Sequence, residues 1–228
     1  LGDSCFHNVY LQFFIFSKYY IGSLYVNIDA AFHTDPGIHR LRPSLRTLTV
    51  YFTITGDDMW QYTGIERPPF ADQPEPGQES VWDYPRPPAL QACAAFIEVG
   101  EPGLRLASTD HAMRIIETAS PPTYYLPPSA VDMTRLIPTR DRSFCEWKGT
   151  ATYWAMADEP SAGAIGWSYA NPSARFRDIA DYLSFYPGRI ACFVDGERVK
   201  PQAGGFYGGW VTSRIAGPIK GGPGTSGW

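Results

Sequence analysis

The sequence predicts a mainly β protein, built from short strands, many turns and one helix. The chain of 228 residues contains 21 Pro and 22 Gly, which interrupt long helices, and 15% of its residues are aromatic, which favours strands. Its hydrophobic fraction of 44% is that of a globular protein with a substantial core. A chain of this length is expected to form one domain with an extension, or two small domains.

The charge and the cysteines argue against several classes of protein. The formal net charge is -4, which provides no long-range attraction for nucleic acid or for an anionic membrane. The four cysteines contain no C-x-x-C pair, so the sequence predicts neither a structural zinc site nor a disulfide framework. We therefore expect a reduced, cytoplasmic protein with no nucleic-acid or membrane partner. These cysteines are Cys5, Cys93, Cys145 and Cys192.

Residues 1–58 differ from the rest of the chain and are predicted to be an N-terminal extension. Two apolar runs, Val9–Phe16 and Tyr19–Val26, are separated by a polar pair, and neither has the ~20 residues that a membrane-spanning helix needs. No cluster of positive charge precedes them, which argues against a signal peptide. Leu48–Ile54 is predicted to be a strand. We expect the extension to be poorly ordered or mispredicted, with Met59 as a natural start.

Residues 59–88 are predicted to form an extended arm. The segment is rich in proline, which is incompatible with a helix or a central strand. Its large aromatic side chains indicate that the arm packs on the core, which is expected over residues 89–228. These side chains are Trp60, Tyr62, Phe70, Trp82 and Tyr84.

Strands are predicted throughout the core. Pro121-Pro122 and Pro127-Pro128 bracket a segment that we expect to be a rigid aromatic loop. Asp195-Gly196 predicts a type I′ turn between Ile190–Val194 and Glu197–Lys200, because both turn residues tolerate positive φ. The other predicted strands are Cys93–Val99, Leu104–Ala107, Ala112–Thr118, Met133–Ile137, Gly149–Met156 and Ala164–Tyr169.

One helix is predicted after Asn171. Asn171 is a candidate N-cap, Pro172 suits the first helical position, and Pro187-Gly188 would end the helix. Apolar residues at helical spacing form one stripe. The stripe consists of Phe176, Ile179, Ala180 and Leu183.

The glycine-rich tail from Gly204 to Trp228 matches no phosphate-binding motif. Its lysine, Lys220, precedes the glycine pair and does not follow a glycine loop. We expect the tail to wrap the domain in tight turns.

The densest chemistry lies in residues 143–154. Cys145 is either a buried structural thiol, the commonest state of a free cysteine, or a nucleophile whose thiolate Lys148 stabilises. A cysteine nucleophile usually needs a base, and the one histidine after Met59 is His111, which is distant in sequence.

Glu117 is the second candidate for chemistry. It is either a solvated strand end paired with Arg114 or Lys148, or a carboxylate at a pocket mouth that is available for acid–base work. Tyr125, Trp147 and Tyr169 are either core aromatics or stacking surfaces for a ligand.

Several motifs of the chain resemble the family known as domain of unknown function 427, over about Met59 to Trp228. The resemblance implies a single β-tent, or Mss-four-like, antiparallel sheet domain with one packed helix. It implies no established activity, although the family is also labelled nucleotidyltransferase-like domain 9. His111 occupies a position where relatives usually carry Arg. The motifs are Trp82–Pro88, Glu117–Pro128, Ser143–Trp154, Gly166–Tyr169 and Gly204–Trp210.

Our leading hypothesis is a pocket that binds a small molecule and acts on it. Lys148 would hold an anionic group, with Glu117 as the acid–base group and Cys145 as a further catalytic candidate. The hypothesis requires these groups to converge on one cavity. The ligand contacts would come from Tyr125, Trp147, Arg114 and Tyr169.

Two alternatives stay open. The first is a non-catalytic protein-interaction module. The second is nucleotidyl transfer, although the one D-x-E of the chain, Asp195-Gly196-Glu197, lies in a predicted hairpin turn. The sequence does not indicate a cofactor, metal ligands, a substrate or an oligomeric state. It also leaves open whether the protein is an enzyme.

Overall fold

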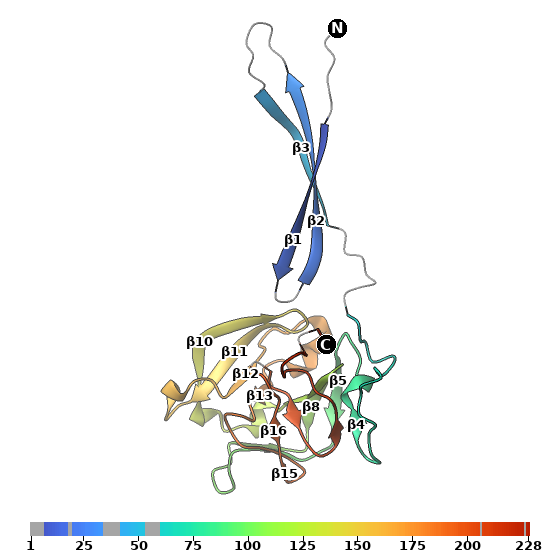
Figure 1. The fold of residues 1–228 in the computed structure, drawn as a ribbon. Coiled ribbons are helices and arrows are strands. Elements are labelled where there is room, and N and C mark those ends of the chain that lie inside the picture. Colours follow the sequence, from blue (N-terminus) through green and yellow to red (C-terminus); the bar gives the residue numbers. More distant parts are fainter. Residues whose placement is uncertain (1–6, 18–19, 34–41, 53–59, 206, 226) are drawn as a thin grey trace. The chain divides into compact units, whose positions relative to one another are not determined.

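The computed structural model describes residues 7–17, 20–33, 42–52, 60–205, 207–225 and 227–228, and it divides into two compact units, Leu1–Trp60 and Gln61–Trp228 (Figure 1). The first unit contains one antiparallel sheet with the order β1-β2-β3. Residues 48–52 of the predicted strand Leu48–Ile54 form the end of β3, while residues 53–59, Met59 among them, lie outside the described residues. That the extension is mispredicted stays a prediction. The three strands are β1 (His7–Ser17), β2 (Tyr20–His33) and β3 (Arg42–Phe52).

The second unit is built from short strands, and the mainly β fold class is confirmed. All its strand pairs are antiparallel except β4 with β18. The strands are β4 (Glu79–Ser80), β5 (Ala89–Cys93), β6 (Ile97–Val99), β7 (Ala107–Thr109), β8 (Ala112–Glu117), β9 (Ser120–Tyr125), β10 (Leu136–Cys145), β11 (Gly149–Met156), β12 (Gly166–Ser168), β13 (Leu183–Phe185), β14 (Cys192–Val194), β15 (Glu197–Arg198), β16 (Lys200–Pro201), β17 (Trp210–Val211) and β18 (Ile215–Ala216).

These strands form several small sheets. The orders are β10-β11-β12-β13, β15-β14-β6-β7, β5-β8-β9, β16-β17 and β18-β4. Figure 1 shows β10 and β11 as the longest hairpin of this unit. No helix in the described part of the chain combines the length and apolar character that crossing a membrane requires. Short 3-10 helices connect the strands: η1 (Val81–Asp83), η2 (Pro128–Ala130), η3 (Met133–Arg135), η4 (Pro160–Ala162) and η5 (Ala174–Ile179).

Several predicted elements are confirmed in position. The predicted strand Gly149–Met156 is β11. Asp195 and Gly196 have φ of 49° and 81°, as a type I′ turn requires, and they join β14 to β15. The predicted strand Cys93–Val99 is divided between β5 and β6, and Met133 lies in η3 rather than in a strand.

The helical segment lies where it was predicted, but its predicted length was wrong. It is only the 3-10 helix η5, and Phe176 inside it has non-helical angles (φ −113°, ψ 18°). Leu183 instead begins β13, pairs with Ser168 of β12, and exchanges backbone hydrogen bonds with Leu126. Burial of Leu183 within the sheet therefore outweighed the helical spacing of the apolar residues.

The predicted aromatic loop is also corrected, because Ser120–Tyr125 forms β9. Pro121 and Pro122 lie where the β8–β9 register shifts, between the pairs of Ile115 and Glu117. β9 is the edge strand of its sheet, and prolines are tolerated at irregular edge positions because no ladder hydrogen bond is lost there. This strand places Tyr124 and Tyr125 in the core.

The arm packs its rings on the second unit, as expected. Trp82 is fully buried and its Nε1 donates to the carbonyl of Pro218, at 3.1 Å. The rings of Tyr62, Phe70 and Trp228 contact it edge-on at centroid distances of 5.1–5.2 Å. Tail and arm therefore share one apolar cluster.

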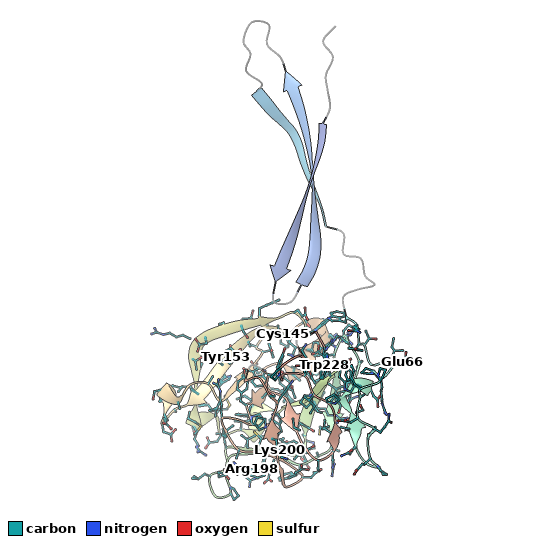
Figure 2. All side chains as sticks on the ribbon, viewed as in Figure 1. Glu66, Cys145, Tyr153, Arg198, Lys200 and Trp228 are labelled. Carbon is teal, nitrogen blue, oxygen red and sulfur yellow. The ribbon has the colours of Figure 1, made fainter. Side chains whose placement is uncertain are left out.

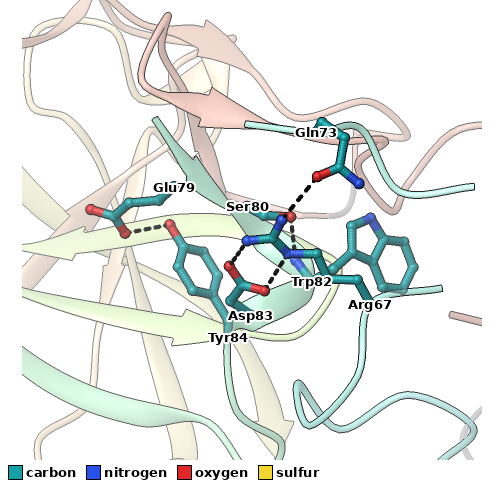
Figure 3. A network of polar contacts seen from close by, with 7 residues as sticks. All are labelled: Arg67, Gln73, Glu79, Ser80, Trp82, Asp83 and Tyr84. Carbon is teal, nitrogen blue, oxygen red and sulfur yellow. Dashed lines mark hydrogen bonds and ion pairs between the residues drawn. The ribbon is translucent and has the colours of Figure 1, made fainter. Parts of the chain in front are cut away.

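A polar network reinforces the arm, as Figure 3 shows. Arg67 donates to both carboxylate oxygens of Asp83, at 2.6 and 2.5 Å. The hydroxyl of Tyr84 donates to Glu79 at 2.8 Å. These contacts join residues of the arm to one another and so stabilise its conformation.

Removing the first unit is expected to leave the second unit stable. A chain that begins at Met59 keeps every apolar cluster described above, so its melting temperature should match that of the full chain. Thermal unfolding followed by circular dichroism measures this. A fall of more than about 4 °C, equivalent to roughly 1 kcal/mol for a domain of this size, would show that residues 1–58 are integral to the fold.

Candidate functional site

Three separate parts of the chain meet at the turn between β8 and β9. Glu117 ends β8, and Ala119 makes the turn with φ of 65°. Arg86 of the arm donates from Nη2 to the carbonyl of Thr118, at 2.8 Å. The backbone N–H of Lys220, in the tail, donates to the carbonyl of Ala119, also at 2.8 Å. The arm and the tail therefore bring two cationic residues beside Glu117.

Arg86 and Glu117 form a largely buried ion pair. Arg86 Nε lies 3.2 Å from Glu117 Oε1, and the two side chains are 3% and 31% exposed. The Nε–H group is buried, yet no hydrogen-bond acceptor is aligned with it in the described part of the chain. A buried donor without an aligned acceptor costs free energy, so this guanidinium has hydrogen-bonding capacity that the protein does not use.

Lys148 comes from the turn between β10 and β11. Its Nζ lies 5.7 Å from the ring centroid of Tyr169, and its ammonium hydrogen-bonds to Cys145. Burial lowers the pKa of Lys148, but the neighbouring Tyr125, Cys145 and Glu117 outweigh burial and raise the pKa above its usual value. Lys148 therefore carries a positive charge at neutral pH.

The two tyrosines beside Lys148 are proton donors at neutral pH. Tyr125 is fully buried, and its hydroxyl accepts from Trp167 Nε1 at 3.3 Å. Burial raises the pKa of both Tyr125 and Tyr169. Both phenols remain protonated, so neither acts as a base.

The structure gathers most of the predicted site residues. Lys148 has Tyr125, Cys145, Glu117 and Tyr169 within electrostatic or ring contact. Trp147, Cys145, Tyr125 and Tyr169 belong to one apolar cluster, and Cys145 is labelled in Figure 2.

Arg114 lies apart from this group. Side chains alternate along β8, so Arg114 faces away from Ile115 and Glu117. Its Nη1 donates to Glu79 at 2.9 Å and its Nε to Gln91 at 3.1 Å. Arg114 thus stabilises the arm on the opposite face of the sheet.

Sequence reasoning missed Arg86 and Lys220. Burial and the neighbouring Arg86 lower the pKa of Lys220, whereas Glu117 and Glu146 oppose them. Its Nζ lies 5.7 Å from the ring centroid of Tyr207. A signal for Arg86 existed, because it lies within the motif Trp82–Pro88. The signal for Lys220 was its position as a single charged residue in a glycine-rich stretch of the tail, which the comparison with phosphate-binding loops does not use.

Two cavities lie elsewhere in the second unit. One of about 620 Å³ is lined by Leu104, Arg135 and Arg189 among others, and one of about 350 Å³ lies between Arg105 and Asp132. Neither includes a predicted site residue. The predicted convergence of these groups on one cavity is therefore not met by either cavity, and the site rests on the grouping of side chains alone. Within the described ranges, no three His, Cys, Asp or Glu side chains are grouped to hold a metal ion.

The sequence of this region matches a known family. Residues 89–199 match the family model described as Domain of unknown function (DUF427). This segment belongs to the DUF427 family. The DUF427 segment contains all seven predicted site residues, whereas Arg86 and Lys220 lie outside it. No curated protein matches the chain.

Replacing Glu117 by Gln is expected to destabilise the domain by about 1–3 kcal/mol, because the Arg86 guanidinium would stay buried without its counter-charge. The free energy of unfolding in urea measures the loss. Adding Arg86→Met should cost less than the sum of the two single losses, because the pair acts as a unit. Glu66→Gln, at an exposed position, is the control. Equal losses for Glu117→Gln and Glu66→Gln would contradict the buried pair.

Proposed function

We propose that the second unit binds a small anionic molecule at the site formed by Arg86, Lys148 and Lys220 around Glu117. One observation carries this proposal: Glu117 lies 3.2 Å from Arg86 of the arm, and its charge also acts on Lys148 of the β10–β11 turn and on Lys220 of the tail. Glu146 is a further carboxylate that acts on Lys220, and its side chain is exposed. Like charges brought together out of water raise the free energy, and a bound anion offsets that cost.

The proposed roles follow from the surroundings of each group. Lys148 binds the anionic group, since it carries a positive charge, and Arg86, in its ion pair with Glu117, adds positive charge to the site. Trp147 and Tyr169 provide aromatic surface for the rest of the ligand. Glu117, at the end of β8, is the acid–base group for any reaction of the ligand.

A screen of anionic probes by thermal shift tests the proposal. The probes are orthophosphate, nucleotides, sugar phosphates and small carboxylic acids. A probe at 100 times its dissociation constant should stabilise the protein by about 2.7 kcal/mol. We expect this stabilisation to be lost in Lys148→Met and in Lys220→Met.

Lys200→Met is the matched control, because Lys200 is exposed on β16, away from Glu117. Stabilisation that is equally large in all three lysine variants would place anion binding elsewhere. A screen in which no probe shifts the melting temperature would also overturn the proposal.

A protein-interaction module is the second candidate, and exposed apolar side chains on β10 favour it. Phe144 is 76% exposed and Ile137 is 37% exposed. Exposed apolar surface is typical of protein contact sites. Nucleotidyl transfer requires carboxylates that share a metal ion, and among the residues that the structure describes no three His, Cys, Asp or Glu side chains are grouped in this way.

A further inference from the structure

The larger cavity of the second unit, of about 620 Å³, has a size typical of small-molecule sites. Three arginines from separate parts of the chain line it: Arg135 at the end of η3, Arg189 after β13 and Arg198 in β15. The carboxylates among its described lining residues are Glu101 and Glu159. Three arginines against two glutamates leave one net positive charge, so the cavity is suited to an anion.

Each of these arginines is held in place by contacts of one nitrogen atom. Nη1 of Arg135 donates to two backbone carbonyls of the β6–β7 loop, at 3.3 and 3.2 Å. Nη1 of Arg189 donates to the carbonyl of Ala164 at 2.6 Å, and Nη2 of Arg198 lies 3.0 Å from Oε1 of Glu101. A guanidinium has five N–H donors. The three groups are therefore positioned by the protein and retain donors that can bind an oxyanion.

The uncharged part of the cavity wall is aliphatic. Leu104, Met156, Ile165 and Ile190 line it, and no aromatic side chain is among its described lining residues. The base of a nucleotide would find no ring on which to stack, whereas a hydrocarbon chain would bury apolar surface there. A guanidinium binds a carboxylate through two parallel hydrogen bonds. An aliphatic carboxylic acid matches both parts of the wall.

Leu104 is a large apolar side chain that the protein keeps exposed at this cavity. It is 67% exposed. Its backbone is fixed, because its N–H donates to the carbonyl of Glu101 at 2.9 Å, and because Gly100 approaches it closely. Gly100 has φ of 98°, and a Cβ there would lie 2.7 Å from the carbonyl oxygen of Leu104, so only glycine fits. A hydrocarbon chain in the cavity would cover this exposed leucine.

We infer that this cavity binds an aliphatic carboxylic acid, at a site separate from the anion site around Glu117. The guanidinium groups bind the carboxylate, and Leu104, Met156 and Ile190 contact the hydrocarbon chain. The cavity shares no lining residue with the site around Glu117. The inference therefore holds or fails independently of the proposed function.

NMR of the methionine methyl groups of the full chain, titrated with octanoate, tests this inference. The protein has four methionines, so labelling with [¹³C]methyl methionine gives few signals. Met156 lines the cavity, whereas Met113 lies in β8 and packs against another apolar cluster. We expect octanoate to shift the Met156 signal, assigned with Met156→Leu, and to leave the Met113 signal unchanged. Octan-1-ol, which lacks the carboxylate, should bind about tenfold more weakly.

Arg198→Glu and Leu104→Asp should each weaken octanoate binding by about tenfold. Both side chains are exposed, at 63% and 67%, so we expect both variants to fold. Arg214→Glu is the matched control for the first, because Arg214 is also 63% exposed and ion-paired. Ile65→Asp, at a position that is 93% exposed, is the control for the second. Neither control residue lines the cavity, and both variants should bind octanoate as the unmodified protein does.

An unshifted Met156 signal, or equal octanoate affinity in all four variants, overturns the inference. Octan-1-ol that binds as tightly as octanoate also overturns it, because the arginines would then play no part. Lys148→Met separates the two proposals, since it should abolish the thermal shift with orthophosphate and leave octanoate binding unchanged. Loss of octanoate binding in Lys148→Met would place octanoate at the site around Glu117 and overturn the second site alone.

Discussion

Above pH 10 the second unit is expected to lose stability steeply as its buried tyrosines ionise. Burial raises the pKa of Tyr124 from 10.0 to about 12, and burial also raises the pKa of Tyr84, Tyr169 and Tyr186. A phenol whose pKa is raised by folding stabilises the fold fully below the pKa of the unfolded chain. That stabilisation is lost as the pH rises through the pKa of the folded protein.

For Tyr124 this window runs from about pH 10 to about pH 12, and its stabilisation is roughly 3 kcal/mol. Tyrosinate absorbance and circular dichroism, followed along one alkaline titration, measure the effect. We expect most tyrosines to ionise late and together with unfolding. Tyr124→Phe removes one ionisable phenol from the core and should move the unfolding midpoint to higher pH. Complete ionisation of the tyrosines with the fold intact would contradict the role of burial.

Trp82→Ala is expected to destabilise the domain by about 3–5 kcal/mol, the usual cost of removing a large buried aromatic side chain. Trp82 is fully buried, donates to Pro218, and lies at the centre of the ring cluster with Tyr62 and Phe70. Removing the indole takes away this packing and leaves the carbonyl of Pro218 without its donor. The midpoint of urea unfolding measures the loss.

Phe144→Ala is the matched control, because it also removes a ring, but one that is 76% exposed. We expect its effect on the free energy of unfolding to stay within about 0.5 kcal/mol. Similar effects for Trp82→Ala and Phe144→Ala would show that the arm is not part of the fold. A much larger loss for Trp82→Ala than for Phe144→Ala would show that the DUF427 segment, residues 89–199, needs the arm to be stable.

The tail also contributes to the stability of the DUF427 segment. Trp210 lies outside the DUF427 segment, yet it is fully buried in the largest apolar cluster, and its Nε1 donates to the carbonyl of Phe185 at 3.0 Å. The matched segment is therefore completed by residues on both sides of it.

Local patterns of the sequence predicted the local elements well. The alternation in Gly149–Met156 and the Asp195-Gly196 pair each reflect the preferences of a few neighbouring residues, which tertiary contacts leave unchanged. The helix prediction failed because the backbone of Leu183 hydrogen-bonds to that of Leu126. The periodicity of apolar residues does not reveal such a long-range contact. Likewise, Pro121 and Pro122 fit a strand only because their positions fall on an irregular edge.

The residues of the candidate site also divide into those that local sequence groups and those that only tertiary contacts bring in. Cys145 and Lys148 lie on one hairpin and could be grouped from the sequence, and Glu117 is one strand away from Tyr125. Arg86 and Lys220 reach the site only through tertiary contacts. Arg86 binds a carbonyl 32 residues further along the chain, and Lys220 binds Ala119 from the far end of the tail. Spacing in one sequence carries no information on such distant pairs.

The parallel pairing of β4 with β18 has a consequence for synthesis of the protein. Together with the bond from Trp82 to Pro218, across 136 residues, it joins the first and last parts of the second unit. Contacts of such long range slow folding, because the chain must close a large loop before they form. The residues around Pro218 must therefore leave the ribosome before the arm can adopt its packed position. Until then the nascent chain exposes the apolar surface on which Trp82 packs, and such exposed surface is prone to aggregation.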